Sequence, residues 1–498
     1  MGSLSNTEGK RYSCHHTVRN APPQQHVLDA IRRTEWKPKV DALTCSTSPH
    51  EHNGPVTRLV LSQDQKFFVS ASHDGTCKVF ETQQILNSSG DLKSCLTIGD
   101  SNVGVAIRPR INDITIIENS HSVASGKSDG SVEVWRVDMV SKDVQLPLQA
   151  HNTAQMSATS KPKVSRVSGY EMIRKVKPHE GEILAVSHFN TDSASIVTYA
   201  SQQGIHTWDL RSDKEPFSLS MRPEMGYITS MAVGNDRNWI VAGTRRGYLA
   251  LWDIRFQKLV KVWQHSNVAP VNRLGTSFAA LSYDNSPKPY VVMGCGLNES
   301  AVFDISSGKC RHCFRVLDPS LSYVDKSSLP TQCTSLPKLN EIHLSSDLEK
   351  RVKGVHKTME SVIDTRVAPP QPCIQSFGGR VGSSGTNYLV TGGTDGYLRY
   401  WDFSDPSKCF TISGLRYSQP RPAYESLEAA SGKIILCRQL PVTKPDEIAS
   451  ATLPKLNKRG VVRPENRHRD AIMDVKKLEY PMKGFISCSR DGLIKFWR

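Results

Sequence analysis

The hydrophobic and polar positions of this chain repeat as a short strand, a turn and a second strand that ends in an aromatic residue. Near the C-terminus this pattern reads Phe485-Ile486-Ser487-Cys488-Ser489-Arg490-Asp491-Gly492-Leu493-Ile494-Lys495-Phe496-Trp497. The Asp-Gly pair supplies the positive φ of a tight turn whose twist matches the flanking strands. Alternation with a period of two gives each strand one face to bury. One copy of the pattern therefore predicts a β-hairpin.

The hairpin pattern occurs seven times along the chain. Besides the copy at Asp491-Gly492 and Trp497, the clear copies have these turns and terminal aromatic residues: Asp74-Gly75 with Phe80, Asp129-Gly130 with Trp135, and Asp395-Gly396 with Trp401. Weaker copies end at Trp208-Asp209, Trp252-Asp253 and Phe303-Asp304. One hairpin cannot bury its apolar face alone, so neighbouring copies must stack. Hairpins that end in Trp-Asp are typical of WD-repeat propellers, whose blades are four-stranded sheets. We predict an all-β fold, a seven-bladed WD-repeat β-propeller with long loop insertions.

A histidine precedes the first strand of several copies, at His52, His179, His265 and His468. In such blades the histidine, a strand Ser or Thr, the turn Asp and the strand Trp form a buried chain of hydrogen bonds. For the last blade this predicts a chain of His468, Ser487 or Ser489, Asp491 and Trp497. The first blade has Phe80 where the tryptophan belongs, so its chain should be shorter.

The distances between copies predict where the insertions lie. A bare repeat needs about 40–45 residues. Where the terminal aromatic residues of neighbouring copies lie much farther apart than this, we place three large insertions, at about 139–178, 315–372 and 405–467. Within the third, Lys433–Arg438 has the pattern of an added strand. We assign 26–498 to the propeller and expect residues 1–25 to be disordered or the remnant of a preceding segment. The last blade lacks an outer strand, and the segment at about 36–46 is expected to supply it and close the ring.

Three short motifs suggest chemistry, and the hairpin pattern accounts better for each. Gly126-Lys127-Ser128-Asp129-Gly130 matches a nucleophile pattern that needs a strand-to-helix elbow, but a second strand follows it. Cys310-Arg311-His312-Cys313 has the spacing of half a zinc site, without a second pair at a suitable distance. Gly378–Gly385 lacks the Gly-Lys-Ser/Thr ending of a phosphate-binding loop. We expect no catalytic site, no metal and no cofactor.

Composition limits the class of protein. The 498 residues are 38% hydrophobic and 22% charged, as in folded domains, and no run of apolar residues approaches the length of a membrane span. The first residues have no apolar core for a signal peptide. The twelve cysteines are scattered, which favours a reduced, intracellular protein. A cytoplasmic protein is therefore expected.

The chain is basic, with a net charge of +15, and two insertions hold much of the excess. Such a charge favours anionic partners. The basic residues that we regard as candidates for an electrostatic contact are Lys161, Lys163, Lys455, Lys458 and Arg459. Solvated loops, contact with an acidic protein or anionic membrane, and contact with nucleic acid all remain open. Nucleic acid is the least favoured, because no stacking aromatic residues are interleaved with these charges.

Two stretches of sequence resemble one family in particular. Trp36-Lys37-Pro38-Lys39 with His50-Glu51-His52-Asn53-Gly54-Pro55-Val56-Thr57-Arg58-Leu59 is similar to the start of the propeller in the class III phosphatidylinositol 3-kinase regulatory subunit. His468-Arg469-Asp470-Ala471-Ile472-Met473-Asp474-Val475 and the ending Ser489–Trp497 resemble the C-terminus of that subunit, a vacuolar-protein-sorting scaffold kinase. The resemblance covers about residues 30–498.

Complete members of that family carry a kinase-like domain and a helical-repeat solenoid before the propeller, and this chain resembles the propeller alone. The resemblance therefore implies a non-catalytic scaffold, and it transfers neither kinase activity nor an N-terminal lipid anchor. The implied partners are the class III lipid kinase and Beclin-type coiled-coil subunits on endosomal or autophagic membranes. Two alternatives remain: a WD-repeat adaptor of another complex, such as one presenting substrates to a ubiquitin ligase, and a basic propeller that binds phosphoinositide or nucleic acid directly.

Overall fold

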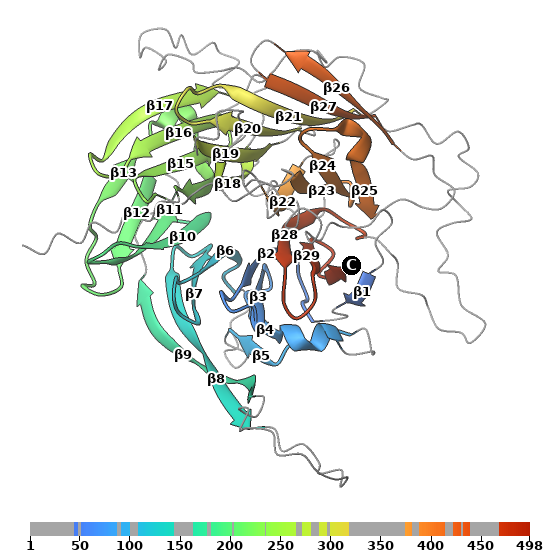
Figure 1. Ribbon diagram of the computed structural model, residues 1–498. Helices are drawn as coiled ribbons and strands as arrows, with labels where there is room; N and C mark the ends of the chain where they lie inside the picture. The colour runs from blue at the N-terminus through green and yellow to red at the C-terminus, as the bar shows by residue number, and fades with distance from the viewer. Residues whose placement is uncertain are drawn as a thin grey trace, which may run out of the picture. The chain divides into compact units, whose positions relative to one another are not determined.

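A computed structural model shows seven β-sheets, all within one compact unit, residues 37–498 (Figure 1). The structure describes residues 44–47, 51–86, 91–99, 108–143, 163–176, 181–201, 204–234, 236–264, 271–279, 288–295, 299–317, 374–380, 388–413, 422–429, 432–438 and 468–498. In these ranges the only helices are three short 3-10 turns, η1 (Thr82–Leu86), η2 (Pro223–Met225) and η3 (Pro406–Lys408). The predicted all-β, seven-bladed propeller is confirmed.

Each sheet is a blade, and in the first six blades four strands follow one another along the chain. The first three blades comprise β2 (Val56–Leu61), β3 (Phe67–Ser72), β4 (Cys77–Glu81) and β5 (Leu96–Ile98); β6 (Ile111–Ile116), β7 (Ser122–Lys127), β8 (Val132–Asp143) and β9 (Lys163–Val176); and β10 (Ala185–Asn190), β11 (Ser195–Ala200), β12 (Gly204–Asp209) and β13 (Ser218–Ser220). The next two comprise β14 (Ile228–Val233), β15 (Trp239–Thr244), β16 (Tyr248–Asp253) and β17 (Lys258–Gln264); and β18 (Val271–Ala279), β19 (Lys288–Cys295), β20 (Glu299–Asp304) and β21 (Cys310–Leu317). The last two comprise β22 (Ile374–Arg380), β23 (Tyr388–Gly393), β24 (Leu398–Asp402) and β25 (Phe410–Ser413); and β28 (Ile472–Leu478), β29 (Gly484–Ser489) and β30 (Ile494–Trp497), joined by β1 (Thr44–Thr47).

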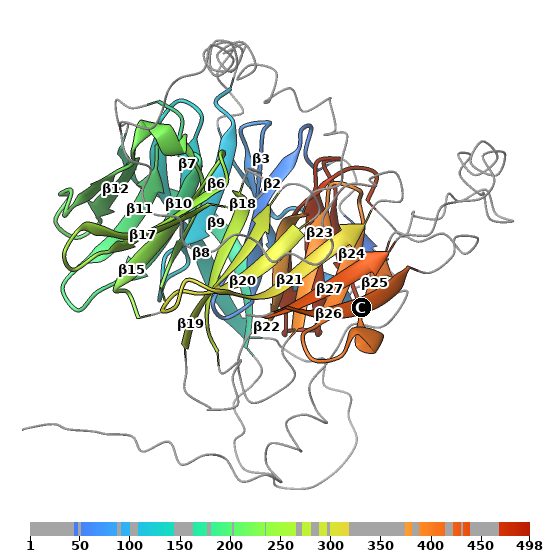
Figure 2. The ribbon, with the colours of Figure 1, turned by 90° about the horizontal axis from the view of Figure 1, so that it is seen from above.

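The seven sheets form a closed ring around their first strands. In order, β2, β6, β10, β14, β18, β22 and β28 each contact the next, and β28 contacts β2. Figure 1 shows the arrangement of the blades face-on, and Figure 2 shows it turned by 90°. The ring is completed in the last sheet, where β1 pairs antiparallel with β30 and Thr44 lies opposite Trp497. The closing strand is thus at the C-terminal end of the segment 36–46 where it was expected, and residues 36–43 lie outside the described ranges. The last blade thereby combines three strands near the C-terminus with one strand from the N-terminal part of the chain.

The apolar core lies between neighbouring blades, as stacking of half-buried hairpins requires. One cluster joins Phe67, Val69 and Val79 of the first blade to Val123 and Trp135 of the second. Equivalent clusters join the second blade with the third, the third with the fourth, the fourth with the fifth, the fifth with the sixth, and the last with the first. Every blade therefore depends on its neighbours for burial of its apolar faces.

Buried carboxylates add polar links between the inner strands. Asp113 on β6 accepts a hydrogen bond from Arg58 Nε of the first blade at 3.0 Å and from the Val186 amide of the third blade at 2.9 Å. Asp474 on β28 accepts a hydrogen bond from the Leu59 amide at 3.1 Å. These side chains connect the last blade and the first three blades along the inside of the ring.

The third insertion contains strands that extend the fifth blade. β27 (Gly432–Arg438) pairs in parallel with β21, and β26 (Ala423–Ala429) pairs with β27, which gives a six-stranded sheet. The strand expected at 433–438 is β27. Its hairpin also contacts the sixth blade, because the Tyr424 ring lies edge-on to Trp401 and the Tyr424 hydroxyl is 3.2 Å from Thr411 Oγ1. The hairpin therefore links two blades.

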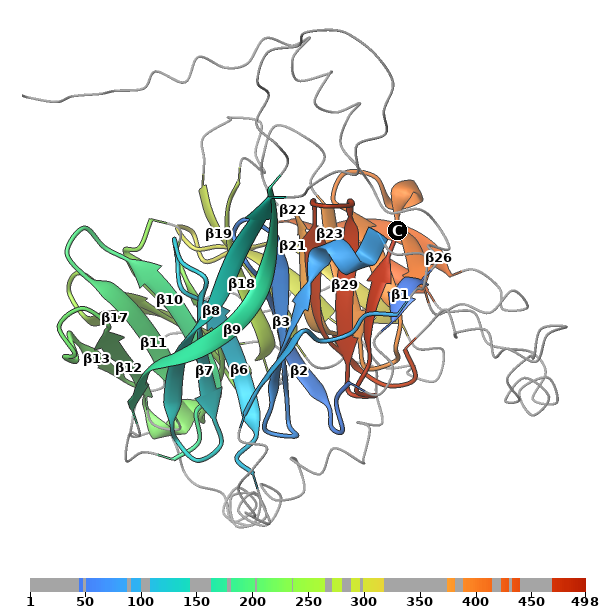
Figure 3. The same ribbon diagram turned by 90° about the horizontal axis from the view of Figure 1, so that it is seen from below.

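The first insertion likewise contains strand rather than loop alone. Residues 139–143 and 163–176 belong to β8 and β9, which pair from Val132 to Asp143 and from Lys163 to Val176 (Figure 3). Of the other insertions, 318–373 and 439–467 lie outside the described residues, as do residues 1–25.

Candidate functional site

The last blade contains the predicted chain of buried hydrogen bonds, and Ser487 rather than Ser489 takes part in it. His468 Nδ1 lies 3.3 Å from Asp491 Oδ2, and His468 Nε2 lies 2.7 Å from Ser487 Oγ. Trp497 Nε1 donates to Ser487 Oγ at 2.7 Å. An ionised carboxylate can only accept, so His468 Nδ1 carries the proton and Nε2 accepts from the serine hydroxyl. The chain fixes one tautomer of a fully buried histidine.

The same geometry governs the protonation of these groups. Burial alone would raise the pKa of Asp491, but hydrogen bonds from His468 and two backbone amides outweigh it and lower that pKa to about 2. Burial lowers the pKa of His468 in spite of the adjacent carboxylate. The pair is therefore a neutral histidine beside a carboxylate.

The first blade has the shorter version. His52 Nδ1 lies 3.0 Å from Asp74 Oδ2, and His52 Nε2 lies 2.7 Å from Ser70 Oγ. Phe80 replaces the indole and stacks on Phe68, with ring centroids 4.9 Å apart. The histidine, serine and aspartate are thus shared between the two blades, and the tryptophan donor is not.

The other predicted blade residues lie at turns and in the cores between blades. Trp401 Nε1 donates to Thr391 Oγ1 at 2.8 Å, whereas Trp208 Nε1 donates to Asp213. Trp135, Trp252 and Phe303 are buried. Gly75, Gly130, Gly396 and Gly492 have positive φ, as their turns require. Carboxylates of Asp129, Asp209, Asp253 and Asp395 accept hydrogen bonds from nearby turn residues. His179 and His265 lie outside the described residues.

The contribution of the Trp497 indole N–H to stability can be tested with phenylalanine, the residue that the first blade has at the equivalent position, Phe80. We expect Trp497→Phe to lower the free energy of unfolding by about 1–2 kcal/mol, because one buried hydrogen bond is lost while the ring stays apolar. Urea unfolding followed by circular dichroism measures the change. The conservative control Phe496→Leu alters the neighbouring core without touching a hydrogen bond. Equal stability of Trp497→Phe and the parent protein would contradict a stabilising role for the indole N–H.

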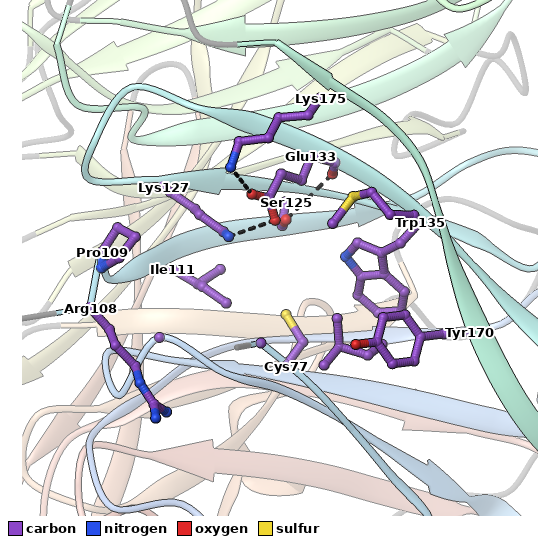
Figure 4. A pocket seen from close by; sticks show the side chains of 14 residues that line it. Cys77, Arg108, Pro109, Ile111, Ser125, Lys127, Glu133, Trp135, Tyr170 and Lys175 are labelled. Carbon is purple, nitrogen blue, oxygen red and sulfur yellow. Dashed lines mark hydrogen bonds and ion pairs between the residues drawn. The ribbon is translucent and has the colours of Figure 1, made fainter. Parts of the chain in front are cut away.

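A cavity of about 470 Å³ lies between the first and second blades (Figure 4). The first blade contributes Cys77 of β4 and Ile98 of β5, and the second contributes side chains from β6, β7, β8 and β9. Trp135 and Tyr170 lie at one side of the cavity, and Arg108 and Pro109 lie at the other (Figure 4). The volume is in the range of about 300–1,000 Å³ typical of ligand pockets.

Two lysines converge on one glutamate at the wall of this cavity. Lys127 Nζ lies 2.5 Å from Glu133 Oε2, and Lys175 Nζ lies 2.8 Å from Glu133 Oε1 (Figure 4). Burial would raise the pKa of Glu133, but the two ammonium groups outweigh it and the pKa is lowered. The hydrogen bond to Glu133 raises the pKa of Lys175. With the exposed Arg108, the lining has three cationic side chains and one carboxylate. The arrangement can bind an anionic group.

A glycine at the turn of the first blade helps to shape the cavity. Gly75 has a φ of +81°, and a Cβ atom built there would lie 2.9 Å from the Cβ of Arg108. Any larger residue would therefore be strained and would collide with the segment leading into β6. Gly75 serves the turn and the close approach of the two blades together.

Sequence reasoning did not identify this cavity. Lys175 lies in the basic first insertion, Glu133 lies within the hairpin at Asp129-Gly130, and Arg108 and Tyr170 belong to no motif. A local signal existed: Lys127 and Glu133 flank the turn of one hairpin, where opposite charges can meet. The contribution of β4 and β5 had no such signal.

The candidate electrostatic residues remain a prediction. Lys161, Lys455, Lys458 and Arg459 lie outside the described residues, and only the backbone of Lys163 is described, in β9. The Cys310–Cys313 segment lies on β21, with both cysteines buried. Among the residues that the structure describes, no group of His, Cys, Asp or Glu side chains is arranged to bind a metal, and no helix is long and apolar enough to cross a membrane.

Comparison with known proteins supports the reading of the fold and of the family. Residues 43–81 match the family described as WD domain, G-beta repeat. The chain is 28% identical over 477 residues to the serine/threonine-protein kinase VPS15 of Arabidopsis thaliana, covering 93% of this chain and 29% of that protein. It is 30% identical over 289 residues to the probable serine/threonine-protein kinase vps15 of Dictyostelium discoideum, covering 58% and 13%. A putative VPS15 of Komagataella pastoris is 22% identical over 454 residues, covering 90% and 30%.

These relatives confirm the resemblance found in the sequence, and the chain is homologous to VPS15 proteins. It spans less than a third of the length of these three relatives. The part that the structure describes is a WD-repeat propeller and not a kinase domain.

Proposed function

We propose that this propeller is a non-catalytic scaffold that helps to assemble the class III phosphatidylinositol 3-kinase complex for endosomal sorting and autophagy. The observation that carries the proposal is the similarity to VPS15 over 93% of the chain. The propeller fold supports it, because a rigid ring of blades presents loops and strand edges to several partners at once. The proposed location is cytoplasmic, peripheral on endosomal or autophagic membranes through the complex.

The proposed partners are the catalytic subunit of the lipid kinase and Beclin-type coiled-coil subunits. We further propose that Lys161, Lys163, Lys455, Lys458 and Arg459 contribute an electrostatic contact to an acidic partner or to anionic membrane. The excess of basic residues in the two insertions supports this contact.

Co-elution tests the scaffold role. The full chain is mixed with the catalytic subunit and the Beclin-type subunit, and the mixture is separated by size exclusion. We expect a shared peak that the propeller does not form with an unrelated coiled-coil protein. A folded propeller that elutes alone would contradict direct assembly. Charge reversal at Lys455, Lys458 and Arg459, compared with reversal at the exposed Lys258, then tests the basic contact.

A further inference from the structure

The outer edge of the second blade differs from the outer edges of the other blades. β9 has 14 residues, whereas β1, β5, β13, β17 and β25, the last strands of the other four-stranded sheets, have three to seven. β8 and β9 continue well beyond the neighbouring strands (Figures 1 and 3). In the described part of the chain no strand pairs with the far side of β9. Such a long edge is a template for another strand.

The same pair of strands carries a concentration of exposed apolar side chains. Four large hydrophobic residues on it are 42–44% exposed: Val140, Tyr170, Met172 and Ile173. Tyr170 and Met172 are two positions apart on β9, so they project from one face of the sheet, and both line the cavity beside Trp135. The apolar side of the cavity therefore continues directly into the exposed strand.

The side chains that line the cavity carry more positive than negative charge. Glu133 neutralises one of the two lysines beside it, and its own side chain is only 8% exposed, whereas the Lys175 side chain is 55% exposed. Arg108 is exposed at the opposite side of the cavity. A carboxylate brought by a partner would meet Lys175 and Arg108 without displacing the buried Glu133.

The fifth blade shows what can occupy an outer edge in this fold. There β27 adds to β21 as an extra strand, and β26 follows it. That addition comes from this chain itself, and its side chains reach the neighbouring blade. The edge of β9 offers the corresponding position, beside a cavity that faces the first blade.

We propose that β9 and the adjoining cavity bind an extended segment of a partner protein in which acidic residues neighbour a large apolar residue. The apolar side chain enters the cavity against Trp135, Tyr170 and Met172, and the carboxylates pair with Lys175 and Arg108. The backbone of the segment adds to the edge of β9, as in other cases of strand addition. A peptide fits this site better than a lipid surface, because the cavity is concave and the lysine pair is held by a glutamate. The proposal rests on the geometry of β9 and the cavity and does not require the proposed lipid-kinase complex.

Selection from a random-peptide phage library on the full chain tests the proposal. Two variants are compared with the parent protein: Tyr170→Ser with Lys175→Glu at the site, and Val260→Ser with Lys258→Glu on β17, where exposed residues of the same kinds lie on another outer strand. Thermal unfolding establishes that both variants fold. If the double variant at the site does not, Lys175→Ala alone replaces it.

We expect selected peptides to combine acidic residues with a neighbouring Leu, Phe, Trp or Met. A synthetic copy should bind the parent protein and the β17 variant equally and the site variant about tenfold or more weakly, and salt should weaken binding. Selection of peptides without this combination, or equal binding to the site variant, overturns the proposal. Failure to select any peptide, together with sedimentation on phosphatidylserine vesicles that the site variant loses, would assign the surface to membrane instead.

Discussion

Replacing Asp113 by alanine is expected to lower the free energy of unfolding by about 3–5 kcal/mol, the largest effect of any single change considered for this propeller. The substitution leaves the buried Arg58 guanidinium without its 3.0 Å carboxylate partner and leaves the Val186 amide without its acceptor. Both lost partners belong to other blades, so the change weakens two blade contacts at once. Urea unfolding of the full chain measures it.

Two further variants help to interpret this result: one removes the charge of Asp113 but keeps a hydrogen-bond acceptor, and the other removes an exposed carboxylate for comparison. Asp113→Asn keeps an oxygen acceptor of nearly the same shape, so we expect it to restore part of the lost stability. Asp138→Ala removes an exposed carboxylate that pairs with Arg136 at 3.1 Å, and exposed pairs contribute only about 0–1 kcal/mol. If Asp113→Ala and Asp138→Ala lowered the free energy of unfolding by equally small amounts, the buried contacts of Asp113 would not stabilise the packing of the inner strands.

The importance of Asp113 could not be predicted from the sequence, although the blade that contains it could. Turns such as Asp129-Gly130 are local, because a few adjacent residues determine their geometry. The hydrogen-bond chain of the last blade could also be predicted from the sequence, because its residues occupy regular places in a repeat: His468, Ser487, Asp491 and Trp497. Asp113 occupies an ordinary strand position, and its role arises only when β2, β6 and β10 meet in the ring.

The insertions illustrate the same limit at a larger scale. The apolar run at 433–438 predicted a strand, but its partner is β21, more than a hundred residues earlier in the chain. A short apolar run does not specify which exposed edge it joins, because every outer strand offers similar backbone groups. The cavity needs side chains from two sheets, so only the proximity of Lys127 and Glu133 was foreseeable. The basic contact at Lys455, Lys458 and Arg459 stays a prediction.

Acidification is expected to destabilise the propeller well before its carboxylates are protonated, through His188. This histidine joins two blades: the Glu118 amide of the second blade donates to His188 Nδ1 at 3.0 Å, and His188 Nε2 lies 2.9 Å from Ser195 Oγ. Burial, with a smaller effect of Arg237, lowers the pKa of His188 to about 4. Protonation of Nδ1 would also remove the acceptor of the Glu118 amide.

The sign of the effect follows from comparing the folded and unfolded chains. An unfolded histidine binds its proton near pH 6.5, whereas folded His188 does not until about pH 4. The stability that depends on neutral His188 is therefore complete above pH 6.5 and is lost as the pH falls from 6.5 toward 4. Linkage gives a loss on the order of 2 kcal/mol between pH 7 and pH 5 from this one group.

Urea unfolding at a series of pH values between 7 and 5 measures this loss. His188→Gln keeps a polar side chain that does not titrate, so we expect the variant to be less stable at pH 7 but to lose less stability on acidification. His206→Gln, at a histidine that pairs with Glu215 at the surface, is the matched control. Since His312 and His73 also have pKa values lowered to about 4 by burial, the His188 variant should reduce the pH dependence without abolishing it. An unchanged slope in His188→Gln would show that the contact between the second and third blades does not depend on a neutral histidine.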